Sequence, residues 1–314
     1  MSNSSASYLV GANSEVLVMS KIKKPSSEEL SAILFLAPIF IGFVIFILIP
    51  ILFTVVLSFV DYNKIGPLNM DFVGLKNYMN VFSDELAMNG YLQSLYFSIL
   101  YVPAMLILSL LLAILINKGF YFRTATRTMI FMPYVSNVTA VAMVWSLILD
   151  PIKGPVNELL KLMGVSNPPL WLGGVNTSLI SVIIVNVWIN LAFQTVVFLA
   201  ALQGVSKDLY ESASIDGAGT WRKFINITVP SISPITFFLV ITTLIGSFQN
   251  YAIVKLLTNG GPGTSSRVIS LNIYEEAFTF NRYSFASAQA MILFLVILII
   301  TLIQWKWQKK WAQN

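Results

Sequence analysis

Six apolar segments alternate with polar connections along the chain. Each is at least as long as the roughly 20 residues that a helix needs to cross a bilayer. None of them contains Asp, Glu, Lys or Arg, so every charged side chain lies in a connection or a tail. We therefore predict six transmembrane helices, over residues 31–60, 91–117, 128–149, 177–202, 233–254 and 284–305. The first is longer than one span needs, and we expect Pro38 and Pro50 to kink it or its end to follow the membrane interface.

The composition narrows the class of protein further. Hydrophobic residues make up 56% of the 314 residues and charged residues only 11%, whereas a soluble domain carries about a quarter charged residues. The chain has no cysteine and no histidine. This excludes disulfides, Cys/His metal sites, a thiol nucleophile, and a histidine acid, base or proton relay. The fold class that follows is an all-α membrane protein, with membrane lipid around it and without a metal site.

The distribution of Lys and Arg predicts the orientation. With a cytoplasmic N-terminus, about 12 of the 19 lysines and arginines lie on the inside, although the loops on the two sides have similar lengths. We expect both termini inside, with residues 1–30 as a cytoplasmic tail, 31–305 as the six-span domain and 306–314 as a second tail. The Ser/Asn-rich start lacks the continuous apolar core of a secretory signal, and we expect residues 1–18 to be dispensable. The net charge of +5 then reflects cytoplasmic loops rather than nucleic-acid binding.

The absence of charge from the spans excludes several transport mechanisms. Proton- or ion-coupled carriers need a titratable or ion-ligating group near the midplane, and voltage sensors need arginines in a span. The sequence also has neither a potassium-filter motif nor a Gly-x-x-x-x-Gly-Lys-Ser/Thr phosphate loop. Its Gly-rich stretch at 259–263 is interpreted as a tight turn. Two classes remain: a passive channel or scaffold, and a transport subunit driven by a separate motor.

One cytoplasmic connection, residues 204–233, has the pattern of a folded element. Ser206 can cap a short amphipathic helix, which breaks at residues 217–219. A second helix begins near Thr220, and we expect Pro230 to end it. Such a half-apolar helix–turn–helix fits a docking element for another protein. An interfacial helix whose basic side chains reach to the lipid headgroups explains the same pattern without a partner.

The spacing in this loop resembles the Glu-Ala-Ala loop of ABC importer permeases. That motif has Glu-Ala-Ala, three residues, Gly, nine residues, Ile, one residue and Leu-Pro. Five positions match it in register: Glu211, Ala213, Gly217, Ile227 and Pro230. Ser212 replaces the second-position Ala and Val229 replaces Leu, whereas Asp216 and Ala218 on either side of the glycine also fit.

Other segments are similar to carbohydrate-type permeases of the maltose, glycerol-phosphate and raffinose group. They are 35–38 with 57–59 in the first span, Arg127 and Pro133 followed by Trp145, and residues 256–262 after the fifth span. The resemblance extends over residues 30–305 and is closest to the MalF-like member of the heterodimeric pair. The large external domain and the extra N-terminal spans of some relatives are missing.

The resemblance implies a type I ABC importer permease in a bacterial inner membrane. A second, homologous permease would complete the passage, and an external solute-binding protein would deliver a sugar or oligosaccharide. Two ATPase subunits, which bind ATP and Mg, would dock below, so this chain would be no enzyme and hold no cofactor itself. Glu211 would be the centre of a coupling helix in a groove of the ATPase, and Pro230 and Pro234 would fix the angle between loop and span.

Uncharged polar and aromatic residues in the fourth and fifth spans mark the expected substrate path. They are Asn186, Trp188, Asn190, Phe193 and Gln194 in the fourth span, and Thr243, Ser247, Asn250 and Tyr251 in the fifth. Helical spacing places the three amides of the fourth span on one face and Thr243, Ser247 and Asn250 on another. Sugars bind through amide and hydroxyl hydrogen bonds and flat aromatic faces. These positions also match where maltose-type permeases hold sugar.

Alternatives stay open at this point. The polar stripes also fit interhelical hydrogen bonds that serve only as structural glue. The solute also fits glycerol phosphate or a uronate oligomer, although an anion would need a fixed positive group. No span has one; Lys255, after the fifth span, is the only nearby cation on this chain, and a partner permease is able to supply others. A passive channel or scaffold is the alternative from a different class.

Overall fold

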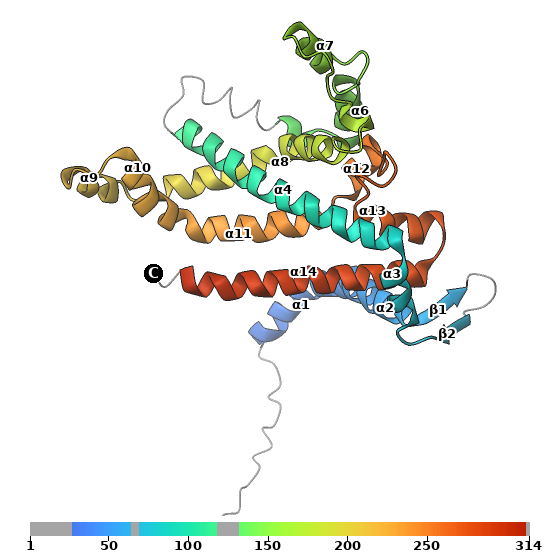
Figure 1. The fold of residues 1–314 in the computed structure, drawn as a ribbon. Helices are drawn as coiled ribbons and strands as arrows, with labels where there is room; N and C mark the ends of the chain where they lie inside the picture. Colours follow the sequence, from blue (N-terminus) through green and yellow to red (C-terminus); the bar gives the residue numbers. More distant parts are fainter. Residues whose placement is uncertain (1–26, 64–68, 118–131, 312–314) are drawn as a thin grey trace, which may run out of the picture. The chain divides into compact units, whose positions relative to one another are not determined.

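The computed structural model describes residues 27–63, 69–117 and 132–311 (Figure 1). The chain divides into two compact units, residues 1–52 and 53–314, and each is described by itself. The described residues are predominantly helical. Most of the predicted N-terminal tail and the basic segment 118–131 lie outside the described residues, so their cytoplasmic location stays a prediction.

The first unit is a long helical stretch with one π-helical turn. Helix α1 spans Ser27–Phe43, the π turn spans Val44–Leu48, and α2 spans Ile49–Ser58 and runs on into the second unit. Pro50 is the second residue of α2 and has no N–H to donate to the preceding turn. The wider turn directly before it accommodates the missing hydrogen bond, as π bulges in helices do.

The second unit contains one small sheet and most of the helices. Strands β1 (Val60–Asn63) and β2 (Asn69–Phe72) form an antiparallel pair in which Val60 lies opposite Phe72. The helices are α3 (Lys76–Ser83), α4 (Glu85–Asn117), α6 (Val138–Ile148), α7 (Pro155–Leu162), α8 (Ser178–Gln203), α9 (Lys207–Ile215), α10 (Thr220–Lys223), α11 (Val229–Phe248), α12 (Tyr251–Leu257), α13 (Ile269–Tyr274) and α14 (Tyr283–Trp311). A 3-10 turn covers Trp171–Gly173, and π turns cover Phe224–Thr228 and Glu275–Thr279.

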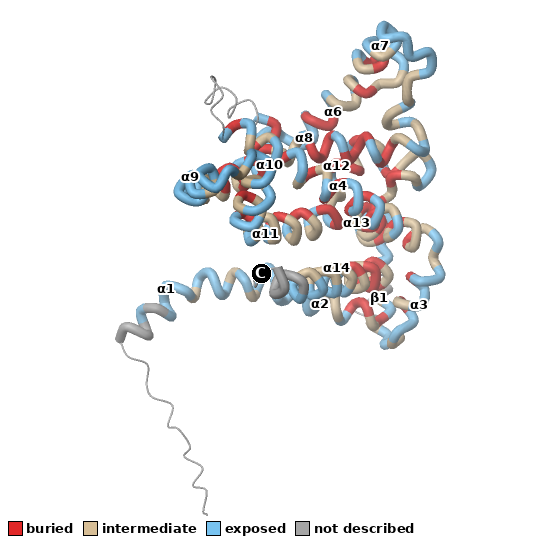
Figure 2. The backbone as a smooth tube through the Cα atoms, turned by 60° about the vertical axis from the view of Figure 1, so that its left-hand side comes forward, coloured by how far each residue is buried: buried red, intermediate tan, exposed pale blue. Residues whose placement is uncertain are grey.

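The core of this unit lies where α4 packs along α8 and α11. One buried cluster joins Phe97 of α4 to Val182 of α8 and Val254 of α12. A second cluster joins Phe198 of α8 to Leu239 of α11. In Figure 2 the buried positions follow these facing sides of the helices, while other sides stay exposed. Side chains of membrane helices that face lipid are exposed in the same way, so burial here marks helix–helix contact.

Among the described residues, five helices are long and apolar enough to cross a membrane. They are 33–58, 85–117, 178–203, 220–248 and 283–306. These correspond to the first, second, fourth, fifth and sixth predicted spans. The predicted third span, 128–149, is represented by a helical turn at residues 132–135 and by the 11-residue α6, because residues 128–131 are outside the described part. A membrane protein of several helices is confirmed, whereas six spans remain a prediction.

The fifth span differs from its prediction at both ends. The segment 233–254 was expected to be one helix, but α11 ends at Phe248 and α12 begins at Tyr251. Asn250 lies between them with φ −78° and ψ 60°, outside the helical region. The prediction that Asn250 shares a helix face with Thr243 and Ser247 is therefore wrong. Hydrophobic periodicity does not show such a break because apolar residues continue on both sides of it.

At its other end, the fifth span continues into the loop 204–233. Pro230 was predicted to end the second helix of the loop. It is instead the second residue of α11. Helix α10, the π turn Phe224–Thr228 and α11 form one helical path from Thr220 to Phe248. A π turn again precedes the proline, as it does before Pro50. The prediction failed because it assumed an α-helix, in which proline at that position breaks the hydrogen-bond ladder.

Ion pairs hold the connection between α12 and α14. Lys255 Nζ donates to Glu275 at 2.9 Å, and Arg267 also donates to Glu275. Arg282 donates to both carboxylate oxygens of Glu276 at 2.5 Å. Burial of the Glu275 carboxyl opposes its ionisation, but the hydrogen bond from Lys255 and the charge of Arg267 outweigh it, so the pKa of Glu275 lies below its usual range. Both carboxyls are buried and paired, as a buried charge requires.

Candidate functional site

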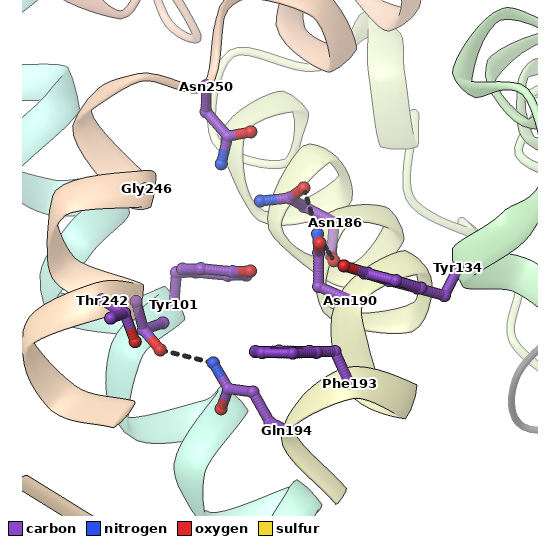
Figure 3. A pocket seen from close by; sticks show the side chains of 10 residues that line it. Tyr101, Tyr134, Asn186, Asn190, Phe193, Gln194, Thr242, Gly246 and Asn250 are labelled. Carbon is purple, nitrogen blue, oxygen red and sulfur yellow. Dashed lines mark hydrogen bonds between the residues drawn. The ribbon is translucent and has the colours of Figure 1, made fainter. Parts of the chain in front are cut away.

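A polar cavity of about 210 Å³ lies between α4, α8 and α11 (Figure 3). We call it the central cavity. Its lining has no charged side chain and consists of Tyr101, Tyr134, Asn186, Asn190, Phe193, Gln194, Thr242, Thr243, Gly246 and Asn250. Six of these ten were predicted from the sequence as part of the substrate path. The cavity therefore combines amides, hydroxyls and aromatic rings, the groups with which proteins bind uncharged polar solutes.

Helix α8 supplies the amides on one side of the central cavity. Asn190 Nδ2 donates to the backbone carbonyl of Asn186 at 2.9 Å and to its side-chain oxygen at 3.0 Å. The backbone carbonyl is only an acceptor, so this contact fixes the orientation of the Asn190 amide. The Asn186 Nδ2 is buried and has no hydrogen-bond partner among the described residues. A free, buried donor beside a cavity is a candidate for binding a ligand oxygen.

A side-chain hydrogen bond ties α8 to α11 beside the central cavity. Gln194 Nε2 donates to Thr243 Oγ1, whose hydroxyl donates to the Leu239 carbonyl at 2.5 Å. Figure 3 shows the Phe193 ring between the side chains of Asn190 and Gln194. The hydrogen bond between Gln194 and Thr243 directly supports the alternative that these side chains hold two helices together. Both residues nevertheless line the cavity.

Four lining residues were missed by the sequence reasoning: Tyr101, Tyr134, Thr242 and Gly246. Tyr101 is buried in α4, a span that was treated only as apolar. Tyr134 stacks on Phe193, with 5.9 Å between ring centroids and 16° between ring planes. Gly246 lines the cavity with its backbone. The space beside it is open, since a Cβ there would meet nothing within 4 Å. The only sequence signal for these positions was a tyrosine within an apolar segment, as at Tyr101 and Tyr134.

Three predicted path residues lie outside the central cavity. Ser247 is fully buried, and its hydroxyl is 2.6 Å from that of Ser98 on α4. Trp188 packs edge-on against Trp145, with centroids 5.5 Å apart. The Tyr251 ring packs against Tyr274 instead. Helical spacing had placed Ser247 on the face of Thr243, but its neighbour depends on how the helices pack.

The loop 204–233, which was predicted to be cytoplasmic and is here called the docking loop, begins with the exposed helix α9. Ser206 caps it by accepting from the Asp208 N–H at 3.2 Å. Glu211 and Ser212 lie exposed on this helix, and Ala213 is half-buried. Asp216 is the C-terminal cap, and Gly217 follows with φ +72°, a left-handed conformation that favours glycine. The sequence therefore folds into the predicted helix with its break at glycine.

The second half of the docking loop packs back on the first. Ala218 N–H donates to the Ala213 carbonyl at 2.8 Å and closes the turn. The hydroxyls of Tyr210 and Thr228 lie 2.8 Å apart, and Lys223 donates to Ser214. Ile227 lies in the π turn and Pro230 follows it at the start of α11. These contacts join α9 to the helical path that continues to the central cavity.

The docking loop also exposes large apolar side chains. Ile215 is 87% and Trp221 73% exposed, and Leu209 is half exposed. No residue of α9 is buried. Exposed apolar side chains around a charged centre are typical of a surface that contacts another protein or the membrane interface.

The acidic side chains of the described residues do not form a cluster. No three His, Cys, Asp or Glu side chains gather in this part of the chain in a way that would hold a metal ion. The acidic residues with strong contacts, Glu275 and Glu276, are each occupied by basic side chains. The chemistry available in the central cavity is therefore hydrogen bonding and ring stacking.

Residues 105–310 match the family described as the binding-protein-dependent transport system inner membrane component. The chain belongs to this family. The match includes α8, the docking loop and α11, and hence the loop that resembles the Glu-Ala-Ala motif and all residues that line the central cavity except Tyr101. The chain is thus a permease component of a transport system, and the alternative of a passive channel or scaffold is set aside.

Individual relatives of this permease agree with the family. The chain is 32% identical to the probable ABC transporter permease protein YurN of Bacillus subtilis, over 88% of this chain and 95% of the relative. It is 32% identical to the sn-glycerol-3-phosphate transport system permease protein UgpA of Yersinia pestis, over 77% of this chain and 82% of the relative.

A solved structure has the same fold as this permease. It is a chain of a bacterial alginate ABC transporter, determined in complex with an alginate pentasaccharide-bound periplasmic protein. The TM-score is 0.80 at 26% sequence identity, and the match covers 91% of this chain and 96% of that chain. The prediction of an ABC importer permease from the docking-loop spacing is therefore confirmed.

Proposed function

We propose that this permease forms, with a second homologous permease, the passage of an ABC importer for a sugar or oligosaccharide in a bacterial inner membrane. The observation that carries the proposal is the uncharged, polar and aromatic lining of the central cavity. Hydroxyl-rich solutes are held by amides, hydroxyls and ring faces. An external solute-binding protein delivers the solute, as the complex of the related alginate transporter suggests. Nucleic acid has no part in this function.

The driving force comes from two separate ATPase subunits, which bind ATP and Mg. The docking loop supports this assignment, because its exposed α9 carries Glu211 at the motif position and a closed turn joins it to the helical path of α10 and α11. A movement imposed on α9 is transmitted along this helical path to Thr243 and Gly246 of the central cavity. The contacts of Tyr210 with Thr228 and of Lys223 with Ser214 stiffen the connection.

A second candidate is the same kind of importer for an acidic solute. Two relatives favour it, since one handles sn-glycerol-3-phosphate and another belongs to an alginate transporter. The lining of the central cavity argues against it, because a phosphate or carboxylate is best bound by Arg or Lys. Lys255 lies in the last turn of α12 and Arg267 lies after this helix, and both bind Glu275. An uncharged saccharide is therefore the main proposal.

The test is a reconstituted transporter with a panel of solutes. The tagged chain is purified with the subunits that accompany it, placed in liposomes with the solute-binding protein, and assayed for solute-stimulated ATP hydrolysis. Neutral mono- and oligosaccharides, alginate oligomers and glycerol phosphate form the panel. Stimulation by a neutral saccharide supports the proposal, whereas stimulation only by the acidic solutes supports the second candidate. Purification without a second permease and an ATPase contradicts both.

A further inference from the structure

Three aromatic rings stack in a row just beyond the central cavity. Tyr251 begins α12, Tyr274 ends α13, and Phe278 lies in the π turn that follows. The centroids of Tyr251 and Tyr274 are 4.3 Å apart and those of Tyr274 and Phe278 are 5.1 Å apart. Tyr274 is 38% and Phe278 67% exposed. The helices thus hold a partly open row of ring surfaces, here called the aromatic platform.

Ion pairs beside the aromatic platform keep its rings in register. Lys255 lies one helical turn after Tyr251, and its partner Glu275 directly follows Tyr274. The Lys255–Glu275 bond and the Tyr251–Tyr274 contact therefore join the same two helical segments side by side. Arg267 adds a second bond to the same carboxylate. The platform is built into a fixed part of the fold rather than carried by a free loop.

Partly exposed charged side chains in the segments that carry the platform argue against lipid tails as its cover. The side chain of Lys255 is 34% exposed and that of Arg282 54% exposed. Exposed charged groups at this level would be costly in the hydrocarbon core. Charged surroundings of this kind favour water or a polar molecule over lipid at the exposed faces of Tyr274 and Phe278.

The part of the central cavity that this chain lines is smaller than a whole oligosaccharide needs. Pockets for drug-sized ligands have volumes of about 300–1,000 Å³, whereas this cavity has about 210 Å³. A longer saccharide must extend beyond it. Asn250 lines the cavity and is followed directly by Tyr251 of the aromatic platform. The backbone thus leads directly from the cavity lining at Asn250 to the first residue of the platform.

We propose that the aromatic platform binds the outer sugar rings of an oligosaccharide whose inner end occupies the central cavity. The inference rests on the proposed function. Flat aromatic faces offer contact area to the apolar faces of sugar rings, and the hydroxyls of Tyr251 and Tyr274 add hydrogen bonds. Glu275 is a positioning residue that holds the platform through Lys255 and Arg267. The platform sets the preference for chain length, and the cavity recognises the end unit.

The test compares saccharide lengths in the reconstituted complex with its binding protein. Uptake rates are measured for the longest and the shortest members of each neutral oligosaccharide series, for the wild type and for Tyr274→Leu and Tyr274→Phe. Leucine keeps apolar volume but has no flat face, whereas phenylalanine keeps the face. We expect Tyr274→Leu to lower the ratio of long to short uptake about threefold to tenfold, the effect of one aromatic contact. Tyr274→Phe stays within about twofold of the wild type.

Phe294→Leu is the matched control, since Phe294 is an exposed phenylalanine of α14 outside the platform. It should leave the ratio unchanged. An unchanged ratio in Tyr274→Leu overturns the platform, and so does transport limited to monosaccharides. Equal loss at all lengths with weaker attachment of the binding protein also overturns it, because it indicates a protein contact. If no saccharide stimulates even the wild type, the proposed function itself fails.

Discussion

Replacing Gly246 with leucine should block the central cavity without disturbing the helix that carries it. Gly246 lies in α11, lines the cavity, and a Cβ there meets nothing within 4 Å. Leucine is also a better helix former than glycine, by up to about 1 kcal/mol. The substitution therefore fills space that the fold leaves open and that the solute would occupy.

The size of the effect follows from the cavity volume. Each added carbon takes about 30 Å³, close to the share of a water molecule in the liquid. The four carbons of leucine then remove about 120 Å³, more than half of the cavity's roughly 210 Å³. Forcing a sugar ring into the remaining space costs about 1–3 kcal/mol by analogy with overpacked cores. This corresponds to a loss of uptake of about fivefold to 150-fold.

The assay measures saccharide uptake and ATP hydrolysis by the reconstituted complex. We expect Gly246→Leu to assemble normally and lose uptake, and Gly246→Ala, which adds one carbon, to keep most of it. Gly42→Leu in α1 is the control, because a Cβ at this helical glycine also meets nothing within 4 Å. Wild-type uptake by an intact Gly246→Leu complex would show that the solute does not pass through the central cavity.

Three further predictions address the coupling, the cavity and the outer ion pairs. Glu211→Ala should leave the protein in the membrane with its ATPase bound but uncouple ATP hydrolysis from uptake; normal uptake at normal hydrolysis would contradict the coupling role. Asn186→Ala should weaken the response to saccharide about twofold to tenfold through loss of a free donor, whereas Ser247→Ala, outside the cavity, should lower only the melting temperature. The lowered pKa of Glu275 means that its ion pairs stabilise the fold fully above the carboxyl's ordinary value of 4.5 and lose this effect as the pH falls through the lowered pKa. The melting-temperature difference between wild type and Glu275→Gln should therefore persist above pH 4.5 and shrink as the pH falls below it; a difference that does not change with pH would refute the ionic explanation.

Helical spacing predicted some of the residues that line the central cavity but not all of them. Asn186, Asn190 and Gln194 were predicted to share one face of a helix, and all three line the cavity. The prediction held because an unbroken α-helix fixes directions four residues apart. On the fifth span the same reasoning failed at Asn250, because the helix breaks before it. Asn250 nevertheless reaches the cavity, by a different backbone path.

The prolines show the opposite case, in which a local rule was overruled. Proline lacks the N–H that an α-helix needs, so Pro230 was expected to end a helix. A π turn at Phe224–Thr228 takes up the missing bond, and the helix continues from the docking loop into α11. This continuity, which the sequence rule denied, is what joins the loop to the cavity.

The sequence by itself determined the membrane class, the family and the docking loop. These follow from uncharged apolar runs and from residue types at fixed spacing, which depend only on the local chain. The tertiary structure decided which polar residues meet. Tyr101, Tyr134 and Gly246 enter the central cavity, while Ser247 turns to Ser98 and Tyr251 to Tyr274. Each of these choices depends on contacts between segments far apart in the chain, which no local pattern encodes.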